Sequence, residues 1–350
     1  MATIREIARL TNVSPTTVSN VIHGRTGKVS VENVRRIQQA LQDHHYFPKY
    51  GLEVMQKGKT RIVGIVAYIR HYYKSLIDDA FYGSIIGALE KEIRQMGYYT
   101  MLLIENDRDA IYQAVKSWNM SGLITITFPS QDYKKLLVVC DVPVIGIDTY
   151  GARAETDYVV SIDDEDGGYQ GTSFLLDAGF DRILMVTETK NGTDMLRYKG
   201  YLRAFCEHGR TPDPNDRILM DVNPHKRHGQ LKGLLQFARR NCAIFCLSDK
   251  LAVEIMNFFL SNGFQIPRDI SVCGFDDNVY ASIVTPQLTT IRQDVDLKAK
   301  MAVELLRTVL KGEEPLERSI VLPTSLVKRG SVREELRRCA GQRPAFRVIA

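Results

Sequence analysis

The stretch VSPTTVSNV, residues 13–21, contains two valines three residues apart, Val18 and Val21, with small hydrogen-bonding side chains between and around them. Ser14 is a preferred residue just before a helix, and Pro15 suits the first helical position. On a helical wheel Val18 and Val21 share one side, because successive residues are about 100° apart. The stretch therefore predicts a short helix with one apolar side and one narrow polar side.

The flanking segments predict two more short helices. Thr3 and Glu6 have the spacing of a capping box, which begins a helix that continues to about Thr11. A third helix is expected from near Ser30, with apolar positions at Val34, Ile37 and Leu41. Three short helices with a tight turn between the first two are typical of a helix-turn-helix domain.

The polar side of the second helix carries Thr16 and Asn20, flanked by Thr17 and Ser19. Asparagine can bind adenine through two hydrogen bonds, and threonine can bind base edges or contact a thymine methyl group. An ordinary solvent-exposed face is the alternative. The basic residues around this helix favour phosphate contact; they are Arg5, Arg9, Arg25, Lys28, Arg35 and Arg36.

The positive charge is concentrated at the two ends of the 350-residue chain, whose net charge is +5. Residues 1–60 contain nine Lys or Arg and four Asp or Glu, and residues 331–350 contain five and two. The segment between them therefore has a net charge of −3. Attraction to a polyanion such as DNA is expected at the ends of the chain.

From residue 61 onward, apolar runs of strand length alternate with amphipathic helical segments. Such alternation predicts parallel sheets with helices on both faces, here arranged as two lobes. Many apolar runs end in polar residues, where open α/β sheets bind ligands. These residues are Asp148, Asp163, Ser248, Asp249, Asp276 and Asp277.

Several classes of protein are disfavoured. No apolar stretch is long enough to span a bilayer and the N-terminus does not look like a signal peptide, so a cytoplasmic protein is expected. No common nucleophile, phosphate-binding or zinc-protease motif occurs, and we expect neither enzyme activity, a cofactor nor a metal. The six cysteines are expected to be buried free thiols. His225 and His228 are expected in a solvated loop.

The N-terminal segments MATIREIARLTNVSPTTVSNVIHG, GKVSVENVRRIQQAL and HHYFPK resemble the DNA-binding headpiece of the lactose-repressor (LacI/GalR) family. The resemblance implies a helix-turn-helix domain at 1–46. It also implies that Pro15, Thr16 and Asn20 select the operator sequence. Its implied phosphate contacts, to which the basic Arg25 is added, are Thr3, Ser14, Thr17, Ser30 and Tyr46.

The hinge expected at 47–60 departs from the family pattern. Family members usually carry a short helix there whose leucine enters the minor groove. In this sequence Met55 stands at that position and is still apolar enough to unstack a base step. Gly51, Leu52 and Glu53 weaken the expectation of a helix, and a flexible linker is the alternative.

The resemblance continues through DAFYGSIIGALE, VSIDDEDGGY, LRYKGY and VCGFDDNVYASIVTPQLTTIRQ. It implies an effector-binding and dimerisation core at 61–330 that has two lobes like those of periplasmic binding proteins. The first lobe would comprise 61–161 and 293–323, and the second 162–292 and 324–340. Residues 331–350 would form a basic tail without the heptad repeat of a tetramer zipper.

The resemblance also implies that an effector binds between the lobes. Arg197 could donate a planar fork, Asp249 and Asp276 could accept from hydroxyl groups, and aromatic rings could stack on a sugar. Arg197 could instead form a surface salt bridge, and Asp276 could cap a helix. The full set of implied contacts is Phe81, Tyr82, Thr149, Asn191, Thr193, Arg197, Val222, Ser248, Asp249 and Asp276.

The sequence is therefore interpreted as a ligand-controlled transcription regulator, in particular a repressor of a carbohydrate-use operon. A homodimer would bind near-palindromic operator DNA, and a small sugar would act as effector. An acidic sugar, a nucleobase and a protein corepressor are alternatives for the signal. Outside this class, the alternatives are a sugar-binding protein without DNA activity and an α/β enzyme with a DNA-binding domain.

Overall fold

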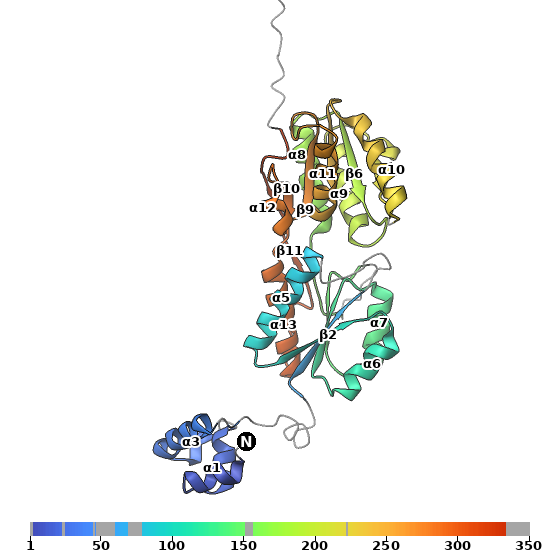
Figure 1. The fold of residues 1–350 in the computed structure, drawn as a ribbon. Coiled ribbons are helices and arrows are strands. Elements are labelled where there is room, and N and C mark those ends of the chain that lie inside the picture. The colour runs from blue at the N-terminus through green and yellow to red at the C-terminus, as the bar shows by residue number, and fades with distance from the viewer. Residues whose placement is uncertain are drawn as a thin grey trace, which may run out of the picture. The chain divides into compact units, whose positions relative to one another are not determined.

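The computed structural model describes residues 3–22, 25–44, 46, 60–68, 79–150, 157–221 and 223–333. The chain divides into two compact units, Met1–Thr60 and Arg61–Ala350. Figure 1 shows the elements of both units. The hinge residues 47–59, with Met55, and the tail beyond residue 333 lie outside the described residues.

The described residues of the first unit form three helices, α1 (Ile4–Leu10), α2 (Pro15–Ile22) and α3 (Val31–Asp43), and a 3-10 turn, η1 (Thr26–Lys28). The predicted capping box at the start of α1 is present, since the Thr3 hydroxyl accepts from the Glu6 amide and the Glu6 carboxylate accepts from the Thr3 amide. The apolar sides of the helices meet in a small core; its buried residues are Ile7, Ala8, Val18, Val21 and Ile37. The helix-turn-helix prediction is confirmed.

The first lobe of the second unit is built on a parallel sheet with the strand order β11-β5-β4-β3-β1-β2. Its strands are β1 (Ile62–Ala67), β2 (Tyr99–Ile104), β3 (Gly122–Ile126), β4 (Val144–Ile147), β5 (Val159–Ile162) and β11 (Ser319–Leu322). Helices α5 (Ala80–Gln95) and α13 (Val295–Leu310) cover one face, and α6 (Arg108–Ser117) and α7 (Ser130–Val139) cover the other (Figure 1).

The second lobe has the strand order β12-β10-β9-β8-β6-β7. Its strands are β6 (Arg182–Thr187), β7 (Arg217–Leu219), β8 (Cys242–Cys246), β9 (Ser271–Asp276), β10 (Thr289–Arg292) and β12 (Ser325–Val327). Helices α8 (Asp164–Asp177) and α9 (Thr193–Glu207) pack on one face, and α10 (Pro224–Leu234) and α11 (Asp249–Ser261) on the other. Two 3-10 turns, η2 (Pro214–Asp216) and η3 (Leu235–Phe237), and the short helix α12 (Val279–Ile283) complete the lobe.

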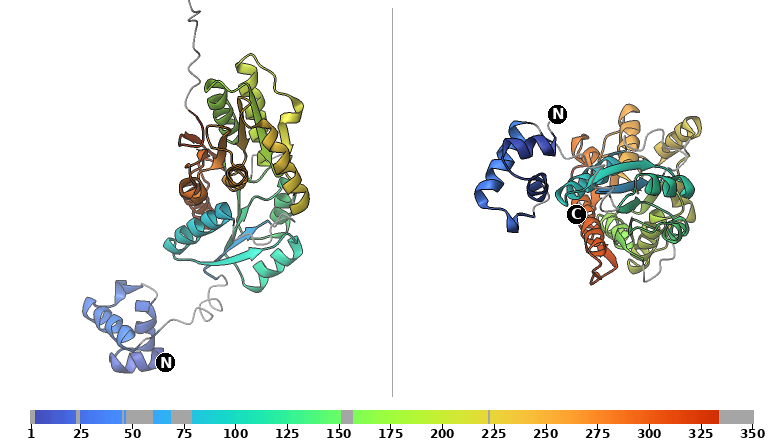
Figure 2. Two further views of the ribbon diagram at one scale, coloured as in Figure 1. Left: turned by 45° about the horizontal axis from the view of Figure 1, so that its top comes forward. Right: turned by 90° about the horizontal axis from the view of Figure 1, so that it is seen from below.

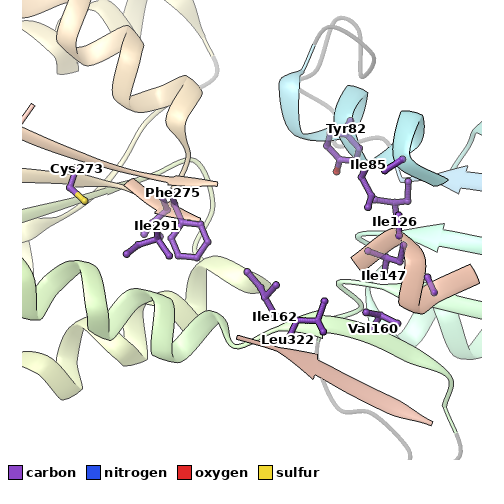
Figure 3. Packing of buried hydrophobic residues seen from close by; sticks show 14 of the residues in the cluster. Tyr82, Ile85, Ile126, Ile147, Val160, Ile162, Cys273, Phe275, Ile291 and Leu322 are labelled. Carbon is purple, nitrogen blue, oxygen red and sulfur yellow. The ribbon is translucent and has the colours of Figure 1, made fainter. Parts of the chain in front are cut away.

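The chain passes between the lobes three times: from β5 to α8, from β10 to α13, and from β11 to β12. Figure 2 shows both lobes from two further directions. One apolar cluster continues through these crossings. In Figure 3, Ile162 and Leu322 lie between Phe275 of the second lobe and Val160 of the first. Buried residues next to the crossings, such as Ile162 and Leu322, therefore join the apolar cores of the two lobes beside their strand ends.

The predicted fold class is confirmed, with several local differences. The β10–β12 pair is antiparallel because β12 returns after the third crossing. Cys206 is exposed on the outer side of α9, whereas Cys242, Cys246 and Cys273 are buried. His225 and His228 lie on helix α10 rather than in a loop, because Pro224 and the capping Asn223 begin a helix there. Within the described part of the chain, no helix is long and apolar enough to cross a membrane.

Candidate functional site

The polar face of α2 is available at the surface of the first unit. Pro15 and Thr16 are exposed, and Thr17 and Asn20 are half-buried. Ser14 caps the helix, since its hydroxyl accepts from the Thr17 amide at 3.0 Å and lies 2.8 Å from the Thr17 hydroxyl. Because Val18 and Val21 are buried behind this face, the core fixes which side chains of α2 point outward.

The other predicted phosphate contacts lie at helix ends. Thr3 and Ser30 cap α1 and α3, and both are exposed. Arg25 is exposed just before η1, and Tyr46 is half-buried beyond the end of α3. Helix N-termini offer backbone N–H groups and a positive dipole end to anions. Two helix caps and an exposed arginine of this unit are therefore accessible for phosphate contact.

The second unit contains a cavity between its two lobes, at the carboxyl ends of strands from both sheets. Thr127 follows β3, Asp148 follows β4, and Asp276 ends β9, as expected for an open α/β sheet. The full lining is Asp79, Phe81, Tyr82, Thr127, Asp148, Thr187, Glu188, Thr193, Asp194, Arg197, Leu247, Ser248, Lys250, Leu251, Asp276, Asn278 and Gln293. Both lobes contribute, so a ligand there would contact both.

Six of the ten predicted effector contacts line this cavity: Phe81, Tyr82, Thr193, Arg197, Ser248 and Asp276. Thr149 is fully buried and does not line the cavity. Asn191 is exposed outside it, with its backbone amide bonded to the Thr189 hydroxyl. Val222 lies outside the described residues.

Asp249 does not line the cavity, because its carboxylate is used within the second lobe. One oxygen accepts from the Thr290 hydroxyl at 2.5 Å and the other from the Asn278 amide at 2.9 Å. Burial raises the pKa of this carboxyl well above its usual value, and the nearby Asp276 adds to the shift. In this structure Asp249 supports the loop after β9 rather than facing the cavity.

Arg197 lies at the side of the cavity within a buried ion pair, not in the surface salt bridge considered above. Its Nε donates to Asp164 at 2.9 Å, and a terminal nitrogen donates to the Leu247 carbonyl at 2.7 Å. The guanidinium carbon lies 3.6 Å from the centre of the Phe275 ring. These contacts hold the guanidinium plane in one orientation at the cavity wall.

Two glycines allow this ion pair to form. A Cβ atom on Gly200 of α9 would lie 1.9 Å from the Glu165 carbonyl oxygen, and one on Gly168 of α8 would lie 2.1 Å from the Arg197 carbonyl oxygen. The two helices therefore approach backbone to backbone. Their contact places Arg197 directly beside Asp164, at the N-terminal end of α8.

Three cavity residues have an unusual backbone. The φ angles of Thr127, Asp148 and Asp276 are 58°, 52° and 119°, a region that non-glycine residues rarely occupy. Such conformations concentrate at functional sites, where surrounding contacts hold them. Gln293 holds Asp276 in this conformation through two hydrogen bonds. Its side-chain Nε2 donates to the Asp276 carboxylate at 2.6 Å, and its backbone N–H donates to the Asp276 backbone carbonyl at 3.3 Å.

The cavity is rich in hydrogen-bond acceptors. Its lining includes five carboxylates, Asp79, Asp148, Glu188, Asp194 and Asp276, but only the cations Arg197 and Lys250. Burial raises the pKa of Asp276 to about 7, although Arg197 and Gln293 favour its ionised form. Burial likewise raises the pKa of Asp164 to about 6. Donor-rich ligands suit such a lining better than anions do.

Sequence reasoning missed several residues of the site. Asp79 caps α5 and forms an ion pair with Lys250 of the other lobe at 3.4 Å. Gln293 lines the cavity, and Lys298 lies buried behind it with Asp148. Thr127 could have been found, because it follows an apolar strand as Asp148 does. Lys298 had no such signal, since a lysine on a helix is ordinarily exposed.

Comparisons with known proteins find relatives of both units. Residues 3–49 match the family of bacterial regulatory proteins called the lacI family, and residues 172–332 match a periplasmic binding protein-like domain. The HTH-type transcriptional repressor PurR of Escherichia coli O139:H28 is 29% identical over 344 residues, which cover 95% of this chain and 97% of PurR. PurR of Vibrio atlanticus is 26% identical over 340 residues, covering 95% and 99%.

Solved structures share the fold. The lac repressor dimer bound to operator and the anti-inducer ONPF has a TM-score of 0.77 and 22% identity, covering 94% of this chain and 98% of that one. A complex of the transcriptional regulator CelR with cellobiose has a TM-score of 0.69 and 23% identity, covering 95% and 100%.

The helix-turn-helix unit and the two-lobed core together define a DNA-binding transcriptional repressor with an effector-binding domain, a regulator rather than an enzyme. The chain combines a helix-turn-helix domain of the lacI family with a periplasmic binding protein-like domain, and PurR repressors align with it along nearly its whole length.

Proposed function

We propose that this repressor binds a near-palindromic operator as a homodimer and is controlled by a neutral, donor-rich small molecule, in the first place a sugar. Pro15, Thr16 and Asn20 would read bases, and the caps and Arg25 would hold phosphates. Residues 1–46 would form the DNA-reading domain, 47–60 the hinge with Met55 at the minor groove, and 61–330 the core. A repressor of genes acts on DNA, which fits a cytoplasmic location.

The observation that carries the effector proposal is the excess of carboxylates in the cavity. Five line it against two cations, and Arg197 already neutralises Asp164. Lys298 and Arg227 lie outside the lining and pair with Asp148 and Glu188, while Asp276 forms no ion pair with the residues described. Sugar hydroxyls would donate to those carboxylates that no cation occupies, Asp276 above all, and Phe81 and Tyr82 offer ring faces or edges to the C–H groups of a sugar. An acidic sugar or sugar phosphate would meet repulsion. Arg227, which could have favoured an anion, is instead paired with Glu188 and Glu254.

A nucleobase is the second candidate. It is favoured by the alignment of PurR repressors with 95% of this chain. A flat base with several N–H groups could also donate to the carboxylates. Because its ring carries acceptors as well, it would also need donors such as Arg197 or Asn278 in the cavity lining.

Both parts of the proposal can be tested with the full chain. Selection from a random duplex pool should enrich near-palindromic sequences. Thermal unfolding should be followed with cellobiose, maltose, D-xylose, hypoxanthine and adenine, and with glucose 6-phosphate and glucuronate as anionic counterparts. We expect a neutral compound to raise the melting temperature. If only an anionic compound did so, the proposed effector class would be wrong.

A further inference from the structure

Lys298 of α13 is a lysine with no exposed surface, which is rare because burying an ammonium group is costly without partners. Its Nζ donates to the two Asp148 carboxylate oxygens at 2.9 and 2.8 Å and to Oε1 of Gln293 at 2.6 Å. An ammonium group has three donors, and these three contacts use all of them. Lys298 therefore engages a cavity carboxylate and a cavity amide at once.

The contact with Lys298 fixes which way the Gln293 amide faces. Oε1 points to the ammonium group, so Nε2 points to Oδ1 of Asp276, at 2.6 Å. The reversed amide would place its NH₂ group against the ammonium group and its oxygen against the carboxylate, and both contacts would be repulsive. A donor at position 298 thus selects the orientation in which Gln293 donates to Asp276.

The result of this chain of contacts is an oriented acceptor in the cavity. Oδ1 of Asp276 is held by Gln293, and Oδ2 makes no hydrogen bond with any of the residues described. The chain also joins the lobes, since Asp148 and Lys298 belong to the first and Asp276 ends β9 of the second. Asp276 of the second lobe therefore offers one oxygen to a ligand, and contacts that begin at Lys298 in the first lobe hold that carboxylate in place.

We propose that Lys298 is a positioning residue for the effector: it occupies Asp148 and turns Gln293 so that the Asp276 carboxylate is presented to the ligand. This inference rests on the proposed function, because it assumes that the cavity binds the effector. The proposal also identifies which carboxylate of the cavity accepts a hydrogen bond from the ligand. Both Asp148 oxygens are occupied by Lys298, so Asp276 is the acceptor in this chain that meets a hydroxyl or N–H group.

The test needs variants that do not leave a buried charge alone. Lys298→Met by itself would leave the Asp148 carboxylate uncompensated and could unfold the chain. We therefore compare two charge-neutral double variants, Asp148→Asn/Lys298→Met and Asp148→Asn/Lys298→Gln. The two variants differ only in whether position 298 offers a hydrogen-bond donor to Oε1 of Gln293. The Met variant is therefore expected to lose the fixed orientation of the Gln293 amide, and the Gln variant is expected to retain it.

The readout is the side-chain ¹H–¹⁵N signal of Gln293 in the full-length chain, assigned by its loss in Gln293→Met. In the wild type this signal should titrate with Asp276 at about pH 7, and Asp276→Asn should abolish the titration. The charged groups facing Asp276 are Arg197 on α9, Lys298 on α13, Asp249 on α11 and Asp79 before α5. Both double variants replace Lys298 and leave Arg197, Asp249 and Asp79 unchanged.

We expect Asp148→Asn/Lys298→Gln to keep the titration of the Gln293 signal and Asp148→Asn/Lys298→Met to lose at least half of its amplitude. A role of Lys298 limited to balancing Asp148 would leave the two variants alike. Equal amplitudes in the two variants, whether both high or both low, would overturn the proposal.

A binding measurement extends the same comparison. Any of the neutral compounds above that stabilises the wild-type chain should bind the Met variant at least fivefold more weakly than the Gln variant. Equal affinity would contradict a role in effector binding. If none of cellobiose, maltose, D-xylose, hypoxanthine and adenine binds the wild type, the proposed effector class fails, and the titration of Gln293 still decides whether Lys298 positions Asp276.

Discussion

The helix-turn-helix unit and the cavity of the core differ in where their polar side chains find partners. On α2 and around it, Thr16 and Arg25 are exposed and ready for an outside partner. At the cavity wall and behind it, Arg197 and Lys298 are buried and already bonded to carboxylates of the same chain. Substitutions in the first region should therefore change DNA binding and leave stability nearly unchanged. Substitutions in the second should change stability, and through it the response to an effector.

The largest effect is expected at the buried ion pair. Arg197→Met should lower the free energy of unfolding by about 3–5 kcal/mol, because Asp164 would be left as an uncompensated buried charge. Urea unfolding of the full chain measures this. The matched control is Arg203→Met on the same helix, whose partly exposed salt bridges should contribute less than about 1 kcal/mol. Equal losses in the two variants would show that burial of the pair is unimportant.

Part of the pH dependence of stability should come from the raised carboxyl pKa values of Asp164 and Asp276. The folded chain holds protons on Asp164 and Asp276 up to about pH 6 and 7, whereas the unfolded chain loses them near pH 4. Their contribution to stability is thus present at pH 4 and lost as the pH rises to 7. Asp276→Asn should flatten this decline in urea unfolding between pH 4.5 and 7.5.

The control for this titration is Asp269, whose pKa is lowered to about 2, chiefly by the Gln265 backbone amide. Its contribution is present above pH 4 and is lost only in stronger acid. Asp269→Asn should therefore leave the slope between pH 4.5 and 7.5 unchanged. If Asp276→Asn did not alter the decline in unfolding free energy between pH 4.5 and 7.5, the raised pKa of Asp276 would be wrong.

The close contact of α8 and α9 gives the next effect. Gly200→Ala should destabilise the core by about 1–3 kcal/mol, because the added carbon would overlap the Glu165 carbonyl. Gly229→Ala is the opposite case, since Gly229 lies in α10 with no atom near its missing side chain. That change should stabilise by about 0.5–1 kcal/mol through helix propensity. Thermal melting of both variants tests the difference.

The smallest effect on stability is expected in the DNA-reading unit. Asn20→Ala should weaken binding to a selected operator by about tenfold to a hundredfold, equivalent to about 1–3 kcal/mol, while the melting temperature stays close to that of the wild type. Fluorescence anisotropy measures the affinity. Gln38→Ala removes an exposed amide from α3 and should change affinity less than twofold. If both variants bound equally well, Asn20 would not read bases.

The same contrast explains what the sequence could predict. The three headpiece helices and most of the core strands follow from local patterns, such as the capping box at Thr3 and the apolar runs. The strand-end positions of Asp148 and Asp276 also follow from the alternation of strands and helices. The short strands β7, β10, β11 and β12 each begin with Arg, Thr or Ser, so no apolar run marks them as it does β4 and β5, and β12 pairs with β10 only through a chain crossing.

The partners of the cavity residues could not be predicted, because they depend on contacts between distant segments. Asp148 and Lys298 are 150 residues apart in sequence, and nothing local marks Lys298 as buried. Asp249 and Asp276 both end or follow apolar strands, yet one supports a loop and the other lines the cavity. Motif resemblance assigns both to the effector, and only their three-dimensional partners separate them.

The most direct test of the account measures operator discrimination by the full-length chain at physiological salt. Anisotropy titrations should compare a near-palindromic duplex from the selection with a scrambled duplex of equal length, each with and without a stabilising neutral compound. We expect affinities that differ by about a thousandfold or more, and a change on adding the compound only for the palindrome. Equal affinity for both duplexes, unaltered by any compound tested, would contradict the account.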